Sequence, residues 1–402
     1  MSANPQDRTL ATRAVHVPVP TDVVGRPVAV PIYQTTVFAH DDPDVLTDSL
    51  DNPRGAYGYS RMANPTVRAL QETVADLEGA VGAVVTSSGM GAIASALGPL
   101  LHPGAHLVVQ QSIYGGTTGL LTDWVRRWGV RVSQVPGDDP AVLREALQPD
   151  TAAVYLETVS NPVTLVADIA GLASVARAAG VPTVVDNTFA TPLLCRPLAL
   201  GADIVVHSAT KYLGGHSDVT AGAVVYADEA RFLAGWNHSV VHGVTPDPFG
   251  AWLVLRGLQT LPLRTRAAGG NAVELSRRLA GHAAVTAVHH PSMPQHPQHE
   301  LAGRQLAGPV AIVAFDLAGG RAAADRFLGR LELIANATSL GGVETLAMHP
   351  ASTSHRHYSA ADLAAAGIAQ GTVRISVGVE DVDDLWADLS AGLDAAQGAR
   401  PR

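Results

Sequence analysis

The sequence predicts an α/β protein in which a domain built on a mostly parallel sheet is followed by a smaller α/β domain. Short apolar runs alternate with helical segments through the first part of the chain, which is the pattern of a doubly wound sheet. Hydrophobic residues make up 47% of the 402 residues and aromatic residues only 5%. Aliphatic side chains must therefore form the core, as they do in parallel sheets covered by helices on both faces.

The chain begins with residues 1–62, which contain many prolines and show no sustained apolar periodicity. The Gly- and Tyr-rich sequence RGAYGYSRMANP begins in this segment and continues to residue 65. Because it has no regular apolar face to bury, we expect an N-terminal arm that wraps around the body of the protein or around a second subunit.

Residues 63–262 carry the alternating pattern and are predicted to form the first domain. Leu70, Val74 and Leu77 share one face of a helix, and Gly79 suits the C-terminus of that helix. The expected strands have the sequences GAVVTSS, HLVVQQ, AAVYLET, PTVVDNT and DIVVHS. Helical sequences such as IAGLASVARAAG lie between these strands, which favours parallel pairing.

Residues 263–402 are predicted to form the smaller domain. A long helical stretch, residues 249–282, runs across the boundary. The strands expected after it have the sequences VAIVAFDL, LELIANA and TVRISVG.

Composition excludes several classes of function. The net charge is −9 and the chain has no basic run, so nucleic acid is not an expected partner. No eighteen-residue apolar stretch and no signal-peptide pattern occur, which favours a cytoplasmic protein. Cys195 is the only cysteine, so no internal disulfide can form, and we expect this residue to be a buried apolar side chain.

Lys211 is the only lysine among the 27 lysine and arginine residues, and it lies in the sequence HSATKYLGGHSD. Arginine can replace lysine as a charge, but a guanidinium cannot condense with an aldehyde to form an imine. Lys211 is therefore a candidate for chemistry that requires a primary amine.

Asp186 ends the apolar strand PTVVD, and ligands of open α/β sheets bind at the carboxyl ends of strands. A buried carboxylate needs a partner, and a protonated pyridine nitrogen would supply one. The alternative is that Asp186 caps the following turn at Asn187 and Thr188.

Further candidates complete a set of ligands for pyridoxal phosphate. Ser208 and Thr210 offer hydroxyl groups beside Lys211, and the turn SSGMG before a helix suits a phosphate. Tyr114 could lay its ring over a planar cofactor. Together with Lys211 and Asp186, these residues supply an amine, an acid, a stacking face and anion donors.

A nicotinamide dinucleotide is the rival cofactor. Gly89, Gly91 and Ala94 match the relaxed fingerprint G-x-G-x-x-A between a strand and a helix. That fingerprint requires an acidic residue about twenty positions later, where this chain has Gln110 and Gln111. An NAD-dependent oxidoreductase is therefore only a distant alternative.

Eight motifs occur along the chain in the order YSRMANPT, SSGMGAI, YGGT, ETVSNP, VVDNTFATP, HSATKYLGGHSD, SLGGVETL and VRISVGVED. Through these motifs the chain closely resembles the Cys/Met-metabolism family of pyridoxal-phosphate enzymes. The resemblance implies the fold of aspartate-aminotransferase-like enzymes, fold type I, with residues 63–262 as the cofactor-binding domain. It also implies a homotetramer of tight dimers with shared active sites.

The same resemblance implies roles for single residues. Lys211 would carry the cofactor as an imine, Asp186 would pair with the pyridinium nitrogen, and Tyr114 would stack on the ring. The phosphate would be held by Gly89, Met90, Ser208 and Thr210. The phosphate of the neighbouring subunit would be reached by Tyr59 and Arg61. The substrate carboxylate would be oriented by Asn161, Ser339 and Arg374.

The strand pattern supports the last of these residues independently. Val373, Ile375 and Val377 point to one face of the strand, and Arg374 points to the other. A planar guanidinium on a rigid strand suits a carboxylate, although a surface charge on an amphipathic strand is the alternative.

The many histidines do not suggest a metal site. They crowd two loops, as His289, His290, His296 and His299 in one and as His355 and His357 in the other. Prolines interrupt the first loop and neither shows helical ligand spacing, so we expect these histidines to be structural.

Two positions depart from the family pattern. Gly116 stands where methionine γ-lyases usually have a cysteine, and Thr338 stands where members that use cystathionine usually have a glutamate. Gly116 leaves room above the cofactor, and Thr338 removes a charge that could meet an ammonium group.

The resemblance implies an enzyme that acts on sulfur-containing or O-acylated homoserine-type amino acids. We expect γ-elimination by a C–S lyase on a substrate such as methionine, homocysteine or cystathionine. Lys211 would remove the α-proton, and Tyr114 would protonate the leaving group. The alternatives are γ-replacement on an O-acylhomoserine, as in a cystathionine γ-synthase or O-acetylhomoserine sulfhydrylase, and attack by a non-sulfur nucleophile in a specialised pathway.

Overall fold

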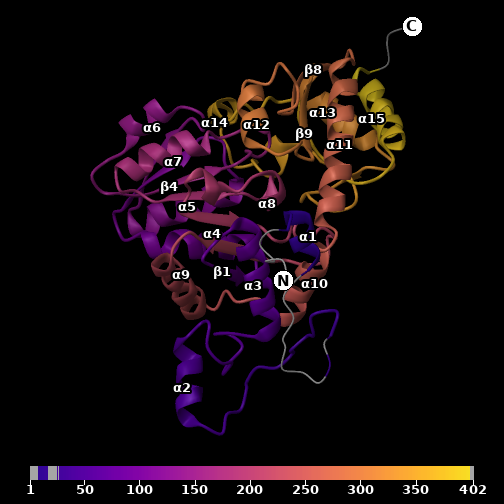
Figure 1. The fold of residues 1–402 in the computed structure, drawn as a ribbon. Coiled ribbons are helices and arrows are strands. Elements are labelled where there is room, and N and C mark those ends of the chain that lie inside the picture. The colour runs from indigo at the N-terminus through magenta and orange to yellow at the C-terminus, as the bar shows by residue number, and fades with distance from the viewer. Residues whose placement is uncertain (1–7, 17–24, 26, 399–402) are drawn as a thin grey trace.

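The computed structural model describes residues 8–16, 25 and 27–398. Two sheets organise this part of the chain (Figure 1). The predicted arm, residues 1–62, lies partly outside the described residues. Its described part contains the helices α1 (Leu10–Val15) and α2 (Pro43–Asp51).

The arm joins the body unevenly. Helix α1 packs against α3, where Ala14 is fully buried and Arg13 pairs with Asp76 at 2.5 Å. Helix α2 projects away from both sheets, at the bottom of Figure 1. After α2, Arg54 forms an ion pair with Glu229 at 2.7 Å. Both ends of the described arm are thus fixed to the body of their own chain, and α2 stands apart from it.

The first sheet has seven strands in the order β1-β7-β6-β5-β4-β2-β3. Its strands are β1 (Gly82–Thr86), β2 (His106–Gln110), β3 (Arg131–Val135), β4 (Thr151–Glu157), β5 (Thr183–Asp186), β6 (Ile204–His207) and β7 (Gly222–Tyr226). Only β7 runs antiparallel to its neighbours, β1 and β6. The prediction of a mostly parallel sheet is confirmed, although β3 and β7 were not expected.

Helices cover both faces of this sheet. They are α3 (Pro65–Glu78), α4 (Gly89–Leu97), α5 (Gly115–Trp128), α6 (Pro140–Ala146), α7 (Ile169–Ala178), α8 (Thr191–Leu194), α9 (Glu229–His242) and α10 (Pro248–Leu258). Successive strand residues alternate between two apolar clusters, so that Val85 lies in the cluster of α3 whereas Val84 lies in that of α4 and α9. Burial on both faces explains why the strands are continuous apolar runs.

The second sheet has five strands in the order β10-β11-β12-β9-β8. Its strands are β8 (Val285–His289), β9 (Ile312–Leu317), β10 (Ala335–Asn336), β11 (Leu346–Met348) and β12 (Thr372–Ser376). The helices of this part are α11 (Leu261–Ala280), α12 (His299–Gln305), α13 (Gly320–Arg330), α14 (Ala360–Ala365) and α15 (Val382–Ala396). An apolar cluster with contributions from α11, α13 and α15 covers one face of this sheet.

Two sequence expectations need adjustment. The helical stretch 249–282 is not continuous, because Gln259 and Thr260 separate α10 from α11. The expected strand LELIANA pairs only over Ala335–Asn336. The predicted domain boundary near residue 262 falls at the start of α11, between the two sheets in sequence, and stays a prediction. Within the described part of the chain, no helix is both long and apolar enough to cross a membrane.

Candidate active site

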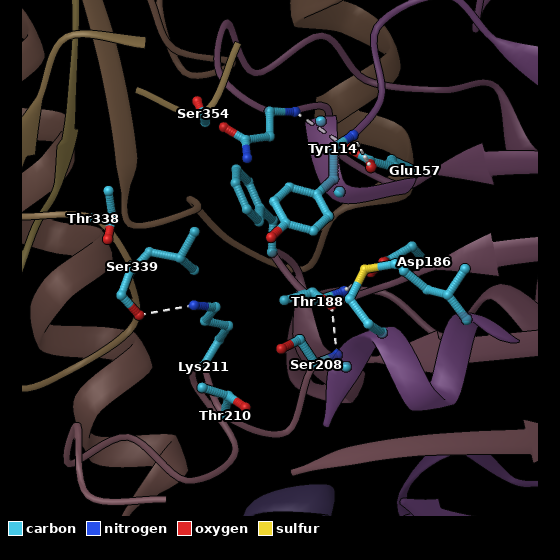
Figure 2. Close-up of a pocket in the computed structure, with 18 of the residues that line it drawn as sticks. Tyr114, Glu157, Asp186, Thr188, Ser208, Thr210, Lys211, Thr338, Ser339 and Ser354 are labelled. Carbon is cyan, nitrogen blue, oxygen red and sulfur yellow. Dashed lines mark hydrogen bonds between the residues drawn. The ribbon is translucent and has the colours of Figure 1, made fainter. Parts of the chain in front are cut away.

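A cavity of about 840 Å³ lies where the carboxyl ends of β4, β5 and β6 meet residues from the second sheet. Most of the predicted site residues line it, namely Gly89, Met90, Tyr114, Asn161, Asp186, Ser208, Thr210, Lys211, Ser339 and Arg374. Figure 2 shows the Lys211 side chain and the Tyr114 ring projecting into this space. The cavity therefore collects residues that lie far apart in the sequence.

The Lys211 side chain is fixed by a residue from the segment between β10 and β11. Its Nζ donates a hydrogen bond to Ser339 Oγ at 2.7 Å (Figure 2). Burial, together with the positive charge of Arg374, lowers the pKa of Lys211 to about 8. Near neutral pH such an amine is neutral, and so nucleophilic, far more often than an ordinary lysine.

Arg374 lies on β12 with its guanidinium in the cavity, as the alternation of the strand predicts. Val373, Ile375 and Val377 lie in the apolar cluster on the other face. Arg374 is 3% exposed and donates to Asn161 Oδ1 at 3.0 Å and to Ser339 O at 2.7 Å. The prediction that this strand separates Arg374 from its apolar neighbours is confirmed.

The Arg374 guanidinium still has unused binding capacity. Its Nε is buried without a hydrogen-bond partner among the described residues, and no carboxylate of those residues forms an ion pair with it. Ser339, whose carbonyl it contacts, has a φ of 94°, a conformation that costs a non-glycine residue roughly 1–3 kcal/mol. A buried cation beside strained backbone suits an anionic ligand such as a carboxylate.

Asp186 is the last residue of β5, and both of its carboxylate oxygens accept hydrogen bonds. Its Oδ1 accepts from Thr188 N at 2.9 Å, and its Oδ2 accepts from Tyr155 Oη at 3.3 Å. Burial raises the pKa of Asp186 above its usual range. The contact with Thr188 shows that capping of the next turn is part of the geometry. A cationic partner in the cavity would stabilise the ionised carboxylate.

Glu157 lines the cavity but was not among the predicted site residues. It ends β4, directly opposite Asp186 in the register of the two strands. Its oxygens accept from Tyr114 N at 2.6 Å and from Asn161 N at 3.3 Å. Burial, followed by the charge of Asp186, raises the pKa of Glu157 well above its usual range. Its position at the end of a buried parallel strand, like that of Asp186, was the signal in the sequence.

The turn before α4 forms a narrow cradle. Ser88 caps the helix by accepting from Gly91 N at 3.0 Å, and the first N–H groups of a helix have no partner within it. A Cβ on Gly89 would lie 2.6 Å from Ser208 Oγ, so the turn lies directly against that hydroxyl. Thr210 Oγ1 lines the same side but already donates to Ala221 O at 3.0 Å. Backbone amides and a hydroxyl are donors that suit a phosphate.

Gly116 controls the place of the Tyr114 ring. A Cβ on Gly116 would overlap this ring and lie 3.1 Å from Met90 Sδ. Gly116 does leave space beside the expected cofactor site, but the Tyr114 ring already occupies part of that space. Thr338 also lines the cavity, beside Ser339.

Tyr59 and Arg61 do not line the cavity of their own chain. Arg61 Nη1 donates to Val240 O at 2.9 Å, and its guanidinium lies 5.6 Å from the centre of the Tyr59 ring. Their predicted role concerns a neighbouring subunit, and it stays a prediction.

The histidine loops are held by ordinary polar contacts. His289 Nε2 lies 2.9 Å from Asp316 Oδ2. The ring of His290 hydrogen-bonds to Ser292 Oγ and to Val310 O. Among the residues that the structure describes, no group of three or more His, Cys, Asp or Glu side chains could hold a metal ion. One histidine, His357, does line the cavity.

Cys195 is buried, as predicted, at 4% exposure. Burial raises the pKa of its thiol to about 12, so this cysteine is not a reactive thiolate near neutral pH.

The residues around the cavity fit pyridoxal phosphate. Lys211 supplies an amine whose pKa is lowered, and Asp186 supplies a half-buried acid with no cationic partner among the described residues. The aromatic face of Tyr114 and the cradle at Gly89 and Ser208 supply the remaining contacts. We find no acidic residue at the end of β2 to hold the ribose of a dinucleotide, since Gln110 stands there.

Comparison with known proteins gives the same result. The family model described as "Cys/Met metabolism PLP-dependent enzyme" matches residues 11–394. The chain is 42% identical over 390 residues to an L-methionine gamma-lyase of Porphyromonas gingivalis, covering 96% of this chain and 97% of the relative. It is 43% identical over 338 residues to an O-succinylhomoserine sulfhydrylase of Pseudomonas aeruginosa, covering 84% and 83%.

A solved structure extends the agreement to the fold. The crystal structure of a cystathionine gamma synthase from Xanthomonas oryzae pv. oryzae matches with a TM-score of 0.92 and 40% identity, covering 98% of this chain and 100% of that chain. The expected fold type I is therefore confirmed, and the dinucleotide alternative has no support. The chain belongs to the pyridoxal-phosphate-dependent enzymes of cysteine and methionine metabolism.

Proposed function

We propose that this enzyme removes the γ-substituent of an L-amino acid by γ-elimination, as a carbon–sulfur lyase. The observation that carries the proposal is the pairing, in one cavity, of the Lys211 amine with the Arg374 guanidinium, which has no carboxylate partner among the described residues. A guanidinium of this kind can hold the substrate carboxylate while the amine acts at the neighbouring carbon. The similarity to an L-methionine gamma-lyase supports the same choice.

The substrate carboxylate binds to Arg374, together with Asn161 and Ser339. Asn161 Oδ1 and Ser339 O hold the guanidinium in place from two sides. Because Ser339 Oγ also contacts Lys211 Nζ, a carboxylate on Arg374 brings the α-carbon close to the amine. The side chains thus orient the Cα–H bond toward Lys211.

The bound pyridoxal phosphate supplies an electron sink for the pair of electrons released at Cα. Asp186 would hold the ring nitrogen in its cationic form, and Gly89, Met90, Ser208 and Thr210 would hold the phosphate. Lys211 Nζ takes the α-proton, and its lowered pKa increases the share of the basic form near neutral pH. The Tyr114 face would cover the ring, and its phenol would be the proton donor for the γ-substituent.

The second half of the reaction removes a proton from Cβ and breaks the Cγ–S bond. Tyr114 donates the proton that the leaving thiolate takes. Water then releases ammonia, so that one amino acid and one water give 2-oxobutanoate, ammonia and one thiol.

The second candidate is γ-replacement, in which a thiol adds to Cγ after the first substituent has left. Similarity to an O-succinylhomoserine sulfhydrylase supports this candidate. Thr338, a neutral side chain beside Ser339, offers no charge for a distal ammonium group, which disfavours cystathionine in both reactions.

The purified holoenzyme tests the two candidates with a panel of amino acids, with and without added thiol. The lyase proposal expects 2-oxobutanoate from a γ-thioether amino acid when no thiol is added. If a product forms only from an activated homoserine together with a thiol, the lyase proposal is wrong and the enzyme catalyses γ-replacement. Borohydride reduction of the holoenzyme should attach the cofactor to the single peptide that contains Lys211.

We also propose that the enzyme is a homotetramer of tight dimers in which Tyr59 and Arg61 serve the neighbouring cavity. Lys211→Ala and Arg61→Ala oligomers should each be nearly inactive. Mixed refolding should restore turnover, because one site of a mixed dimer then has both residues intact. Mass analysis measures the fraction of mixed dimers, and mixed dimers without activity would show that Arg61 acts within its own chain.

A further inference from the structure

Arg356 brings an exposed cation to the lining of the cavity. Its Nη1 donates to the backbone oxygen of Thr353 at 3.0 Å. No carboxylate among the described residues forms an ion pair with it. The acidic side chains that line the cavity, Glu157 and Asp186, both lie at the ends of strands of the first sheet, where backbone amides bind them. Arg356 is therefore free to bind an anion that enters from solvent.

The segment that carries Arg356 is anchored on both sides. The neighbouring His355 is 1% exposed, and its ring packs edge-on against Tyr358 at 4.9 Å. The Tyr358 hydroxyl in turn hydrogen-bonds to Thr118 Oγ1, on α5, at 2.8 Å. Backbone bonds from His355 N to Pro350 O and from Tyr358 N to His355 O close the turn. Because its neighbours are fixed, the backbone of Arg356 stays beside the cavity.

This segment lies on the side of the leaving group. A Cβ on Gly115 would overlap the backbone oxygen of Ser354, so the segment packs directly on the residue that follows Tyr114. Figure 2 shows Ser354 above the Tyr114 ring, whereas Lys211 lies below it. In the proposed reaction Tyr114 protonates the leaving group, so the γ-substituent extends toward the segment of Arg356.

We propose that the γ-substituent of the natural substrate ends in a carboxylate that pairs with Arg356. This inference rests on the proposed function and narrows its substrate class. The carboxylate can belong to a dicarboxylic ester of homoserine or to a carboxyl-bearing thioether, because the two place the same charge at the end of the substituent. Methionine and O-acetylhomoserine end in uncharged groups, so we expect a lower kcat/KM for them.

A matched pair of substrates isolates this charge. S-carboxymethyl-L-homocysteine and S-carbamoylmethyl-L-homocysteine have nearly the same shape and the same α-carboxylate, and they differ in the charge of the distal group. Hydrogen bonds to charged groups indicate a preference of about tenfold in kcat/KM for the carboxylate in the wild-type holoenzyme. Release of 2-oxobutanoate without added thiol measures both rates.

Variants assign the preference to Arg356. Arg356→Gln should bring the ratio of the two kcat/KM values close to one, and Arg356→Glu should invert it. The matched control is Arg304→Gln, which removes the same charge from an exposed arginine outside the cavity lining and should keep the wild-type ratio. The cofactor absorbance of each variant shows whether its site is intact.

The possible results separate this inference from the proposed function. If the wild-type enzyme turns over both compounds with a ratio of kcat/KM values near one, the role of Arg356 is overturned while the lyase activity stands. The same conclusion follows if Arg356→Gln leaves the wild-type ratio unchanged. If neither compound yields 2-oxobutanoate, the amino-acid panel described above still decides the lyase proposal separately. Calorimetric affinities of the holoenzyme for the same two compounds then decide the charge preference, and equal affinities would overturn it.

A second pair of compounds tests whether the carboxylate belongs to an ester. O-succinyl-L-homoserine and its distal monomethyl ester form a second pair that differs in the same charge. A preference for the free acid in this pair alone would assign the carboxylate to an ester substrate. A preference in the thioether pair alone would assign it to a thioether.

Discussion

The lowered pKa of Lys211 predicts an unusually reactive amine in the cofactor-free protein. Burial and the charge of Arg374 bring this pKa from 10.5 to about 8. At pH 7.5 roughly a quarter of a group with a pKa of about 8 is neutral, compared with about one molecule in a thousand for an ordinary lysine. The structure thus predicts about a two-hundredfold gain in neutral amine at that pH.

The single lysine makes the measurement direct. Acetic anhydride reacts with the neutral amine, and the peptide that contains Lys211 reports the rate by mass spectrometry as the pH is varied. The N-terminal amine falls on a different peptide and does not interfere. The rate should rise with pH and level off above about 8. Arg374→Met should move the midpoint upward but only in part, because burial is the larger cause of the shift.

Two results would refute this reasoning. A midpoint near 10.5 in the wild-type protein would show that the folded site does not desolvate the amine. A midpoint that Arg374→Met leaves unchanged would show that the guanidinium charge does not reach Lys211. Arg304→Met is the control, since it removes a distant exposed charge and should have no effect.

Other variants test the remaining site residues. Asp186→Asn should retain the cofactor but lower turnover by several powers of ten, because an amide cannot keep the ring nitrogen protonated; near-normal turnover would require another partner for that nitrogen. Gly116→Ala should displace the Tyr114 ring and lower kcat by about tenfold or more, whereas Gly119→Ala, which adds its methyl group to open space in the same cavity, should be nearly neutral. Equal effects of these two variants on kcat would contradict the steric argument. Glu157→Gln, which resembles the neutral acid that burial favours, should lower kcat less than Glu157→Leu, and equal losses in kcat would speak against a neutral Glu157.

Much of the first domain could be predicted because its strands are buried on both faces. Continuous apolar runs mark such strands directly, and parallel pairing brings their carboxyl ends to one edge. Asp186 was therefore predictable from its place at the end of a strand, whereas Lys211 was predicted because it is the only lysine, and both line the cavity. The direction of β7 was not, since an apolar run has the same pattern whether its neighbours run with it or against it.

The sequence by itself determined the chemistry of this protein: one amine, one acid at the end of a strand, a glycine turn for a phosphate, and an arginine set apart from its apolar neighbours. Only the tertiary structure decided which groups touch. Arg374 binds Asn161 across 213 positions of the chain, and Arg356 reaches the lining of the same cavity from a separate turn. Local patterns report which face of an element is buried, but they contain no distances between elements, and those distances depend on how the two sheets and their connecting segments pack.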